Sequence, residues 1–240
     1  MKSLKIFATG ALLAISLCAS AQSKTTIPNE WQTGYFQWNP STFVPKKGDD
    51  QSFTGLSLGW SKAFSISQTH PLFLEAGVGL QYAFYSEDES ETERVDGERV
   101  KVTLTEKYNG LSMKVPVHLL YAWDIPNSKV QLIPFVGLNL RYNFSGKIKY
   151  EWDASVGGYT LDADDLEEAG FEDQDYNVFD KDDMGGSKNT WKRFQIGWEL
   201  GVKARFNQKY LLGISYGSDF SEIAKKVKIH TTSITLGYCF

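Results

Sequence analysis

Residues 227–240 read VKIHTTSITLGYCF, and this stretch decides the fold. Every second side chain is large or apolar, and the side chains between them are mostly small or polar. Alternate residues of an extended strand point to opposite faces, so this strand has one apolar face and one less apolar face. The apolar face carries His230, Thr232, Ile234, Leu236, Tyr238 and Phe240, and the other face carries Ile229, Thr231, Ser233, Thr235, Gly237 and Cys239.

Six earlier stretches repeat this period of two. They span residues 53–66, 72–84, 111–123, 136–144, 194–206 and 210–217. An eighth strand is expected within residues 31–38, where both faces carry aromatic side chains. Most of these stretches exceed the ~9–11 residues that a tilted strand needs to cross a bilayer.

The composition of the two faces favours a membrane barrel over a soluble β-sandwich. The major face is almost continuously apolar with aromatic residues near its ends, as a lipid-facing band requires. The minor face is rich in Gly, Ser and Asn, which suit the crowded interior of a narrow barrel. The exposed face of a sandwich would instead be rich in Lys, Glu and Thr. We therefore predict an all-β fold, a transmembrane antiparallel up-and-down β-barrel of eight strands.

The expected connections alternate in length, as they do in outer-membrane barrels. Short turns are expected at 67–70, 124–129 and 207–209, and long loops at 39–51, 86–99, 151–190 and 218–227. This pattern predicts that both termini lie in the periplasm and that the long loops lie outside the cell. Within 100–109 the apolar parity is opposite to that from Leu111 onward. The reversal predicts a bulge near 108–110 or a strand that extends above the membrane.

The N-terminal residues indicate export. Lys2 and Lys5 precede an apolar stretch at 11–17, and the sequence Ala-Ser-Ala at 19–21 follows, which is typical of a secretory signal peptide. Cleavage after Ala21 leaves residues 22–240 as the mature barrel domain. A lipoprotein with a lipidated Cys18 is the alternative, but Leu17 stands where such sites want a small residue.

The mature chain has 23 basic and 29 acidic residues, a formal charge of −6, and one cysteine, Cys239. An intrachain disulfide is thereby excluded, and the net acidity argues against nucleic acid as a partner. The predicted partners are outer-membrane lipid and the barrel-assembly machinery. The terminal strand resembles the insertion signal of outer-membrane barrels, with Tyr238 and Phe240 as its aromatic residues.

Two neighbouring segments carry a family resemblance. MKVPVHLLY at 113–121 is followed by IPFVGLNL at 133–140, with a proline inside the first strand and a Pro-Phe-Val-x-x-type start to the second. This arrangement is similar to the porin-like outer-membrane β-barrel family that includes PorT-like proteins, and the similarity covers essentially the whole mature chain. The resemblance implies a small barrel in the cell outer membrane and brings no catalytic residues with it.

An eight-stranded barrel has an interior just wide enough to be filled by side chains. The polar residues expected there are Glu75, Gln81, Lys114, His118, Asn139, Arg141, Glu199, Lys203 and Arg205. Buried charges must pair with one another or with trapped water, since an unpaired buried charge costs several kcal/mol. The lumen is therefore expected to hold a structural ion-pair network, and a narrow path for water or small ions is the alternative. No nucleophile–base set is identified, so no catalytic residues are assigned.

The long loops are strongly acidic. Residues 151–190 contain thirteen acidic and two basic residues, a net charge of −11, and residues 86–99 have a net charge of −5. A solvated surface loop is one interpretation. Binding of Ca²⁺ or Mg²⁺ is the other, because clustered carboxylates are hard oxygen ligands. The candidate metal ligands are Asp162, Asp164, Asp165, Glu167 and Glu168.

The sequence thus predicts a non-enzymatic outer-membrane surface protein whose loops bind a ligand, a partner or the headgroup layer. It does not identify that surface partner, and no cofactor is expected apart from the candidate divalent cation. A narrow porin-like channel is the second hypothesis. An outer-membrane hydrolase or acyltransferase is the third.

Overall fold

The computed structural model describes residues 30–46, 48–95 and 97–240, so the predicted signal peptide at 1–21 lies outside the described residues. Eight long strands form the barrel: β1 (Trp31–Pro45), β2 (Gln51–Ser65), β3 (Leu72–Val95), β4 (Glu98–Tyr121), β6 (Val130–Val156), β9 (Phe194–Phe206), β10 (Tyr210–Asp219) and β11 (Val227–Cys239). The shorter elements are β5 (Trp123–Asp124), β7 (Tyr159–Thr160), α2 (Ala163–Glu168) and β8 (Gln174–Asn177). Among the described residues, no helix is long and apolar enough to cross a bilayer.

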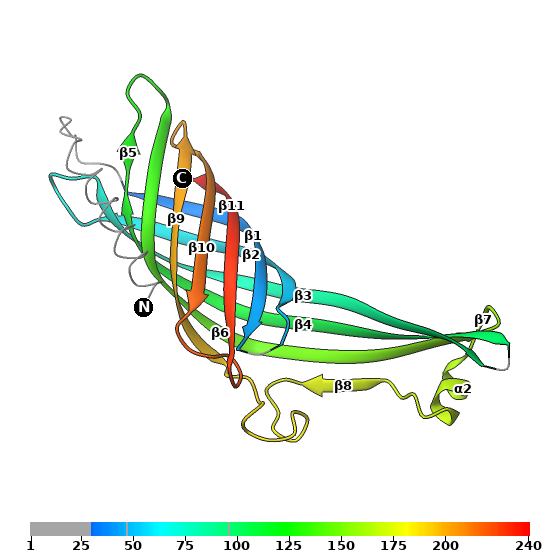
Figure 1. The fold of residues 1–240 in the computed structure, drawn as a ribbon. Coiled ribbons are helices and arrows are strands. Elements are labelled where there is room, and N and C mark those ends of the chain that lie inside the picture. Colours follow the sequence, from blue (N-terminus) through cyan, green and yellow to red (C-terminus); the bar gives the residue numbers. More distant parts are fainter. Residues whose placement is uncertain (1–29, 47, 96) are drawn as a thin grey trace.

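The sheet closes on itself, and all its pairings are antiparallel (Figure 1). The strands follow the order β4-β3-β2-β1-β11-β10-β9-β6, and β4 pairs with β6 to complete the ring. The predicted eight-stranded barrel is therefore confirmed. The first strand, expected within 31–38, runs on to Pro45, so the connection expected at 39–51 shrinks to residues 46–50. The expected loop was wrong because residues 39–43 pair with β2 and residues 41–45 pair with β11, which continues the strand.

The end of the barrel that holds the start of β1 and the end of β11 is called the terminal rim (Figure 1). The three predicted short turns lie at this rim and are confirmed as short connections. The tightest joins β9 to β10, where Asn207 and Gln208 have φ angles of 49° and 59°. Two successive left-handed residues make the turn that matches the twist of a hairpin. The opposite end is the arm rim.

The outer face of the barrel is a band of exposed apolar side chains. Leu58, Leu80 and Leu138, for example, are 67%, 54% and 45% exposed, although they lie in the middle of strands. A soluble protein does not leave so large an apolar surface in water, so this band meets lipid. Aromatic pairs mark its two edges, Tyr210 with Tyr238 at the terminal rim and Tyr142 with Phe144 at the arm rim.

The inside of the barrel contains two apolar clusters separated by polar side chains. The cluster at the terminal rim comprises Trp31, Ala63, Phe73, Leu120, Ala122, Ile133, Phe135, Leu211 and Cys239. The cluster at the arm rim comprises Phe43, Phe53, Ala83, Tyr108, Ile223 and Ile229, with Trp191 packed against it. Large aromatic residues thus fill each end of the lumen.

Three strands continue far beyond the barrel and form an arm (Figure 1). β2 stops pairing with β3 at Phe84, but β3 and β4 remain paired to the hairpin tip at Val95 and Glu98. At about 3.3 Å per residue, the hairpin extends roughly 36 Å beyond that point. The stretch 86–99, expected as a loop, is therefore mostly strand, which is a correction. The other interpretation of the parity reversal was a strand extending above the membrane, and the structure shows that β4 does extend beyond the barrel (Figure 1).

The expected loop at 151–190 is also more structured than predicted. Residues 151–156 complete β6, β8 pairs with the outer edge of β6, and α2 lies near the tip. The predicted bulge near 108–110 is displaced: the register shifts between Leu111 and Ser112, which pair with Ser145 and Asn143. Phe144 is therefore the extra residue, and it lies on β6 rather than on β4. The acidic residues of β3 and of 151–156 suggested a loop by their charge, whereas strand pairing holds them in a sheet; most acidic residues between 162 and 183 lie in α2 and the irregular segments around it.

Candidate functional site

The centre of the lumen holds a network built on two buried glutamates. Glu75, on β3, is 3% exposed. Its Oε2 atom accepts from Lys203 Nζ at 2.5 Å, and its Oε1 atom accepts from Ser61 Oγ at 2.8 Å. His118 Nδ1 lies 3.3 Å from the same Oε2 atom. Because β3, β4 and β9 contribute one titratable side chain each, this group ties three strands together across the lumen.

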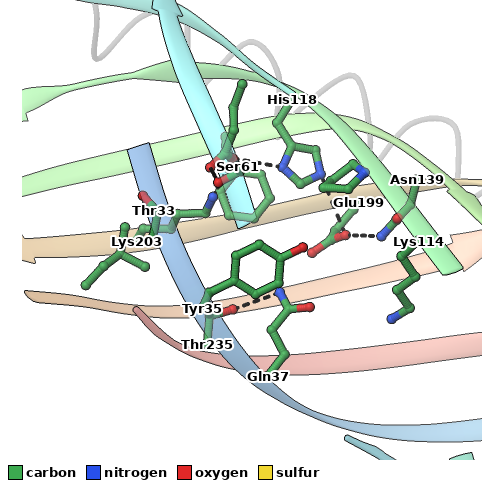
Figure 2. A pocket seen from close by; sticks show the side chains of 14 residues that line it. Thr33, Tyr35, Gln37, Ser61, Lys114, His118, Asn139, Glu199, Lys203 and Thr235 are labelled. Carbon is green, nitrogen blue, oxygen red and sulfur yellow. Dashed lines mark hydrogen bonds and ion pairs between the residues drawn. The ribbon is translucent and has the colours of Figure 1, made fainter. Parts of the chain in front are cut away.

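Glu199, on β9, is the second centre (Figure 2). Its Oε1 atom accepts from Ser215 Oγ at 2.6 Å, and its Oε2 atom accepts from Asn139 Nδ2 at 2.5 Å. His118 Nε2 lies 3.7 Å from Oε2, so the imidazole stands between the two glutamates. The ring also packs on Phe135 with the centroids 4.7 Å apart. His118 is therefore a buried structural link: Nδ1 lies within hydrogen-bond distance of Glu75 and the ring packs on Phe135, while Nε2 faces Glu199 without a hydrogen-bond partner among the described residues.

A third charged pair lies nearer the arm rim. Arg141 Nη2 donates to Asp219 Oδ2 at 2.5 Å, and both side chains are largely buried. Asp219 was not among the predicted lumen residues because the stretch from 218 onward was expected to be a loop. A signal was present in the sequence: Ser215, Gly217 and Asp219 continue the lumen-facing parity of β10.

The remaining predicted lumen residues lie inside the barrel but take no part in these ion pairs. The Arg205 guanidinium lies over the ring of Trp31, 4.1 Å from its centroid. Gln81 is 4% exposed and packs against the backbone of Gly55, where a Cβ would approach its amide nitrogen to 2.2 Å. Lys114 is 7% exposed and makes no ion pair with another described residue. Asn39, which was not predicted, donates to Ser57 Oγ and is fully buried.

The space left in the lumen is small. Two cavities of about 30 Å³ each lie beside Lys114, one toward Glu199 and one toward Arg141. A water needs about 10–15 Å³ of such space, so each cavity has room for one or two waters. Figure 2 shows the residues that line the cavity toward Glu199, with the ring of Tyr35 in the middle. Together with the apolar clusters, these side chains fill most of the lumen among the described residues.

The candidate metal ligands lie at the distal part of the arm. Asp162 is the N-cap of α2, and its carboxylate accepts from the backbone N–H of Asp165. In the part of the chain that the structure describes, no three acidic, histidine or cysteine side chains converge to hold a metal ion. The divalent-cation hypothesis therefore stays a prediction from the sequence.

The two residues predicted as an assembly signal lie on the closing seam. Tyr238 is 48% exposed on the lipid-facing side, where it contacts Tyr210. The backbone of Phe240 exchanges two hydrogen bonds with Gln32, at 3.0 and 3.1 Å, so the last residue closes the ring against β1. The side chain of Phe240 is 66% exposed.

The arm presents an acidic surface along β3. Beyond Phe84 this strand has no partner on its outer side among the described residues. Its exposed acidic side chains are Glu87, Asp88, Glu89, Glu91 and Glu93. None of them forms an ion pair with another described residue. The described part of β3 beyond Phe84 therefore combines an open strand edge with five exposed carboxylates that form no ion pair.

The base of the arm is held by hydrogen bonds that shift local pKa values. Tyr85 donates to Glu106, and burial together with this bond raises the pKa of the Tyr85 phenol. Lys107 Nζ lies 2.5 Å from Glu151 Oε2, and that bond raises the pKa of Lys107. Tyr150 contacts Tyr176 of β8, and burial raises the pKa of Tyr150. These contacts connect β3, β4, β6 and β8 into one sheet.

Comparisons with known proteins agree with the barrel architecture. Residues 9–240 match the family described as outer membrane protein beta-barrel domain. No curated protein matches the sequence. The PorT-like assignment within the barrel proteins stays a prediction.

Several solved outer-membrane structures are similar at low identity. The attachment invasion locus protein Ail of Yersinia pestis, in complex with the heparin analogue sucrose octasulfate, is 15% identical, with 88% of this chain and 100% of that chain covered and a TM-score of 0.37. Neisserial surface protein A is 13% identical, with 89% and 100% covered and a TM-score of 0.38. The outer membrane enzyme PagL is 9% identical, with 84% and 97% covered and a TM-score of 0.37.

Proposed function

The chain belongs to the outer membrane protein beta-barrel domain family, and from that premise we propose that it is a non-enzymatic surface protein. In this proposal the barrel is an anchor, both termini are periplasmic, and the arm projects outside the cell to bind a partner. The observation that carries it is the contrast between a filled lumen and an arm that extends roughly 36 Å beyond the last residue pair of β2 and β3.

Electrostatics indicate the kind of partner. The open edge of β3 combines unpaired backbone groups with five exposed carboxylates, of which Glu89 and Glu91 are central. An exposed strand edge can accept an additional strand, and acidic side chains repel another acidic edge. A partner with a basic extended segment satisfies both conditions. Complementary charge would also raise the association rate and make it sensitive to salt.

The channel hypothesis finds less support. A conducting path would have to pass both apolar clusters, including Trp31 at one end and Phe43 at the other, and the ion pair of Glu75 with Lys203 between them. Reconstitution into planar bilayers tests this point directly. The proposed anchor role predicts no single-channel conductance, and steady conductance by the wild-type barrel would favour the channel.

The enzyme hypothesis also finds less support. His118 is the histidine inside the barrel, and both of its ring nitrogens face buried glutamates rather than a cleft. Its role in tying strands together leaves no open nucleophile–base pair in the described lumen. We therefore keep the binding function as the proposal.

The experiment that tests the proposal places a photo-crosslinking amino acid at Glu89 in living cells. A matched control carries the same amino acid at Leu80, on the lipid-facing band of the same strand. A defined crosslinked protein is expected from position 89 alone, and it should disappear when Glu87, Glu91 and Glu93 are changed to Gln. Equal crosslinking from both positions, or no dependence on those charges, would refute partner binding by the arm edge.

A further inference from the structure

A cavity of about 150 Å³ lies on the outside of the barrel at the arm rim, separate from the lumen. It is lined by Tyr82, Asn109, Gly110, Ser145, Lys147 and Lys149. The cavity lies beside the β-bulge, where Leu111 pairs with Ser145 and Phe144 is the extra residue of β6. A bulge bends its strand and interrupts the regular pairing, which opens space between β4 and β6.

The height of this cavity relative to the bilayer is set by aromatic residues. Tyr82 stacks on Phe84, and Tyr142 contacts Phe144, at the edge of the lipid-facing band. Such aromatic belts lie at the level of the lipid headgroups. Lys147 follows Phe144 by three residues on the same strand, so its ammonium lies where acyl chains give way to headgroups.

The polar groups at the cavity are donors. Lys147 is exposed and makes no ion pair with another described residue. Lys149 lies 3.4 Å from Asp175, but both side chains are about half exposed, so this pair is weak and leaves the ammonium accessible. Asn109 Oδ1 accepts from Tyr82 Oη at 2.5 Å, so the Asn109 amide NH₂ remains as a further donor.

A neighbouring lysine adds to the positive potential. Lys107 lies directly across from Lys149 on β4, with its own ammonium bound to Glu151. Like charges opposite each other destabilise a sheet. A bound anion would reduce the repulsion between these lysines, and basic residues next to a membrane attract anionic headgroups.

We propose that this cavity binds the phosphate group of a lipid headgroup in the outer leaflet. Lys147, Lys149 and the amide of Asn109 contact the phosphate, and the acyl chains follow the apolar face below Leu111. The proposal rests on the proposed topology only for the choice of leaflet. The barrel would thereby hold a lipid at the base of the arm, where it orients the arm relative to the membrane.

The test uses the purified full-length barrel and native mass spectrometry in micelles containing phosphatidylglycerol or phosphatidylcholine. The variant is the double change Lys147→Gln and Lys149→Gln. The matched control is Lys129→Gln and Lys209→Gln, which removes two exposed lysines at the terminal rim. Each lysine near an anionic surface contributes a factor of about five in affinity, so the variant should bind phosphatidylglycerol about 30-fold more weakly than wild type.

The control variant should retain phosphatidylglycerol as wild type does, and all three proteins should show the same heat-dependent shift in gel mobility, which reports a folded barrel. Equal losses in the two double variants would overturn the site. Displacement of the lipid by millimolar inorganic phosphate would overturn the assignment to a lipid, whereas retention supports it. Cell-surface protease accessibility tests the leaflet separately, so a failed topology is distinguishable from a failed binding site.

Discussion

Replacement of Glu199 by Leu is the sharpest test of the lumen network. The carboxylate is 7% exposed and accepts from Ser215 at 2.6 Å and from Asn139 at 2.5 Å. It also faces His118 Nε2 at 3.7 Å and is one of the acidic groups nearest Lys114. Leucine fills a similar volume but offers no acceptor and no negative charge. The change therefore removes the chemistry of the site while it preserves most of the packing.

The expected cost follows from what is left behind. Two donors lose their acceptor, and an unsatisfied buried donor costs about 1–3 kcal/mol. Removing one partner of a buried charged group costs about 3–5 kcal/mol, a figure that already includes such losses. We therefore expect Glu199→Leu to lower the free energy of unfolding by about 3–5 kcal/mol. Glu199→Gln keeps one acceptor oxygen and should cost less, about 1.5–3 kcal/mol.

Urea unfolding of the barrel in lipid vesicles, followed by tryptophan fluorescence, measures these differences. Glu91→Gln is the matched control, because Glu91 is exposed on the arm and should change stability by less than about 0.5 kcal/mol. If Glu199→Leu also shifts the unfolding free energy by less than about 0.5 kcal/mol, the glutamate does not hold the network together. The free energy of unfolding should increase in the order Glu199→Leu, Glu199→Gln, wild type, whether the urea concentration is raised or lowered.

Three further predictions concern assembly, topology and pH. Deleting Phe240 removes the backbone bonds to β1 at the seam and should sharply lower outer-membrane yield; a normal yield of folded barrel contradicts this role. Trypsin added to intact cells should cut at Arg94 or Arg99, on either side of the arm tip; cleavage only after lysis would show an inverted topology. Because the pKa of Tyr85 is raised in the folded arm, its neutral phenol contributes its full stabilisation below pH of about 10, the ordinary tyrosine pKa. That stabilisation is lost as pH rises from there through the higher pKa of the folded state. Tyr85→Phe should therefore reduce the loss of stability above that pH in circular-dichroism unfolding.

The faces of the strands could be predicted from the sequence because side-chain alternation is a local property. Glu75 and Glu199 were placed in the lumen by parity alone, and the structure puts both there. Their partners could not be predicted. Lys203 meets Glu75 across 128 residues of sequence, because the stagger of the closed barrel brings β9 toward β3. The alternation of side chains along a strand predicts which face a residue occupies, but its partner across the lumen depends on how the barrel closes.

The arm was missed for a different physical reason. The glutamates from Glu87 to Glu93 alternate with Asp88, Ser90 and Thr92, and a stretch so rich in Glu and Asp has low strand propensity. Pairing overrides it, because β4 supplies a continuous partner from Lys107 to Glu98. The apolar ends of the lumen were missed because Phe43 lay in an expected loop and Trp191 follows one. Loops with large aromatic residues can return to cover a barrel.

The bulge at Phe144 connects the barrel, the arm and the outer cavity. Before it, Arg141 and Asn143 of β6 face the lumen; after it, Ile148, Tyr150 and Trp152 take the covered face. Without the extra residue, these apolar side chains would point to the opposite side and lose their contacts with β8 and the segment around α2. The same shift turns the odd-numbered lysines outward at headgroup level. One inserted residue therefore determines both what the arm packs against and which charges it presents to the membrane.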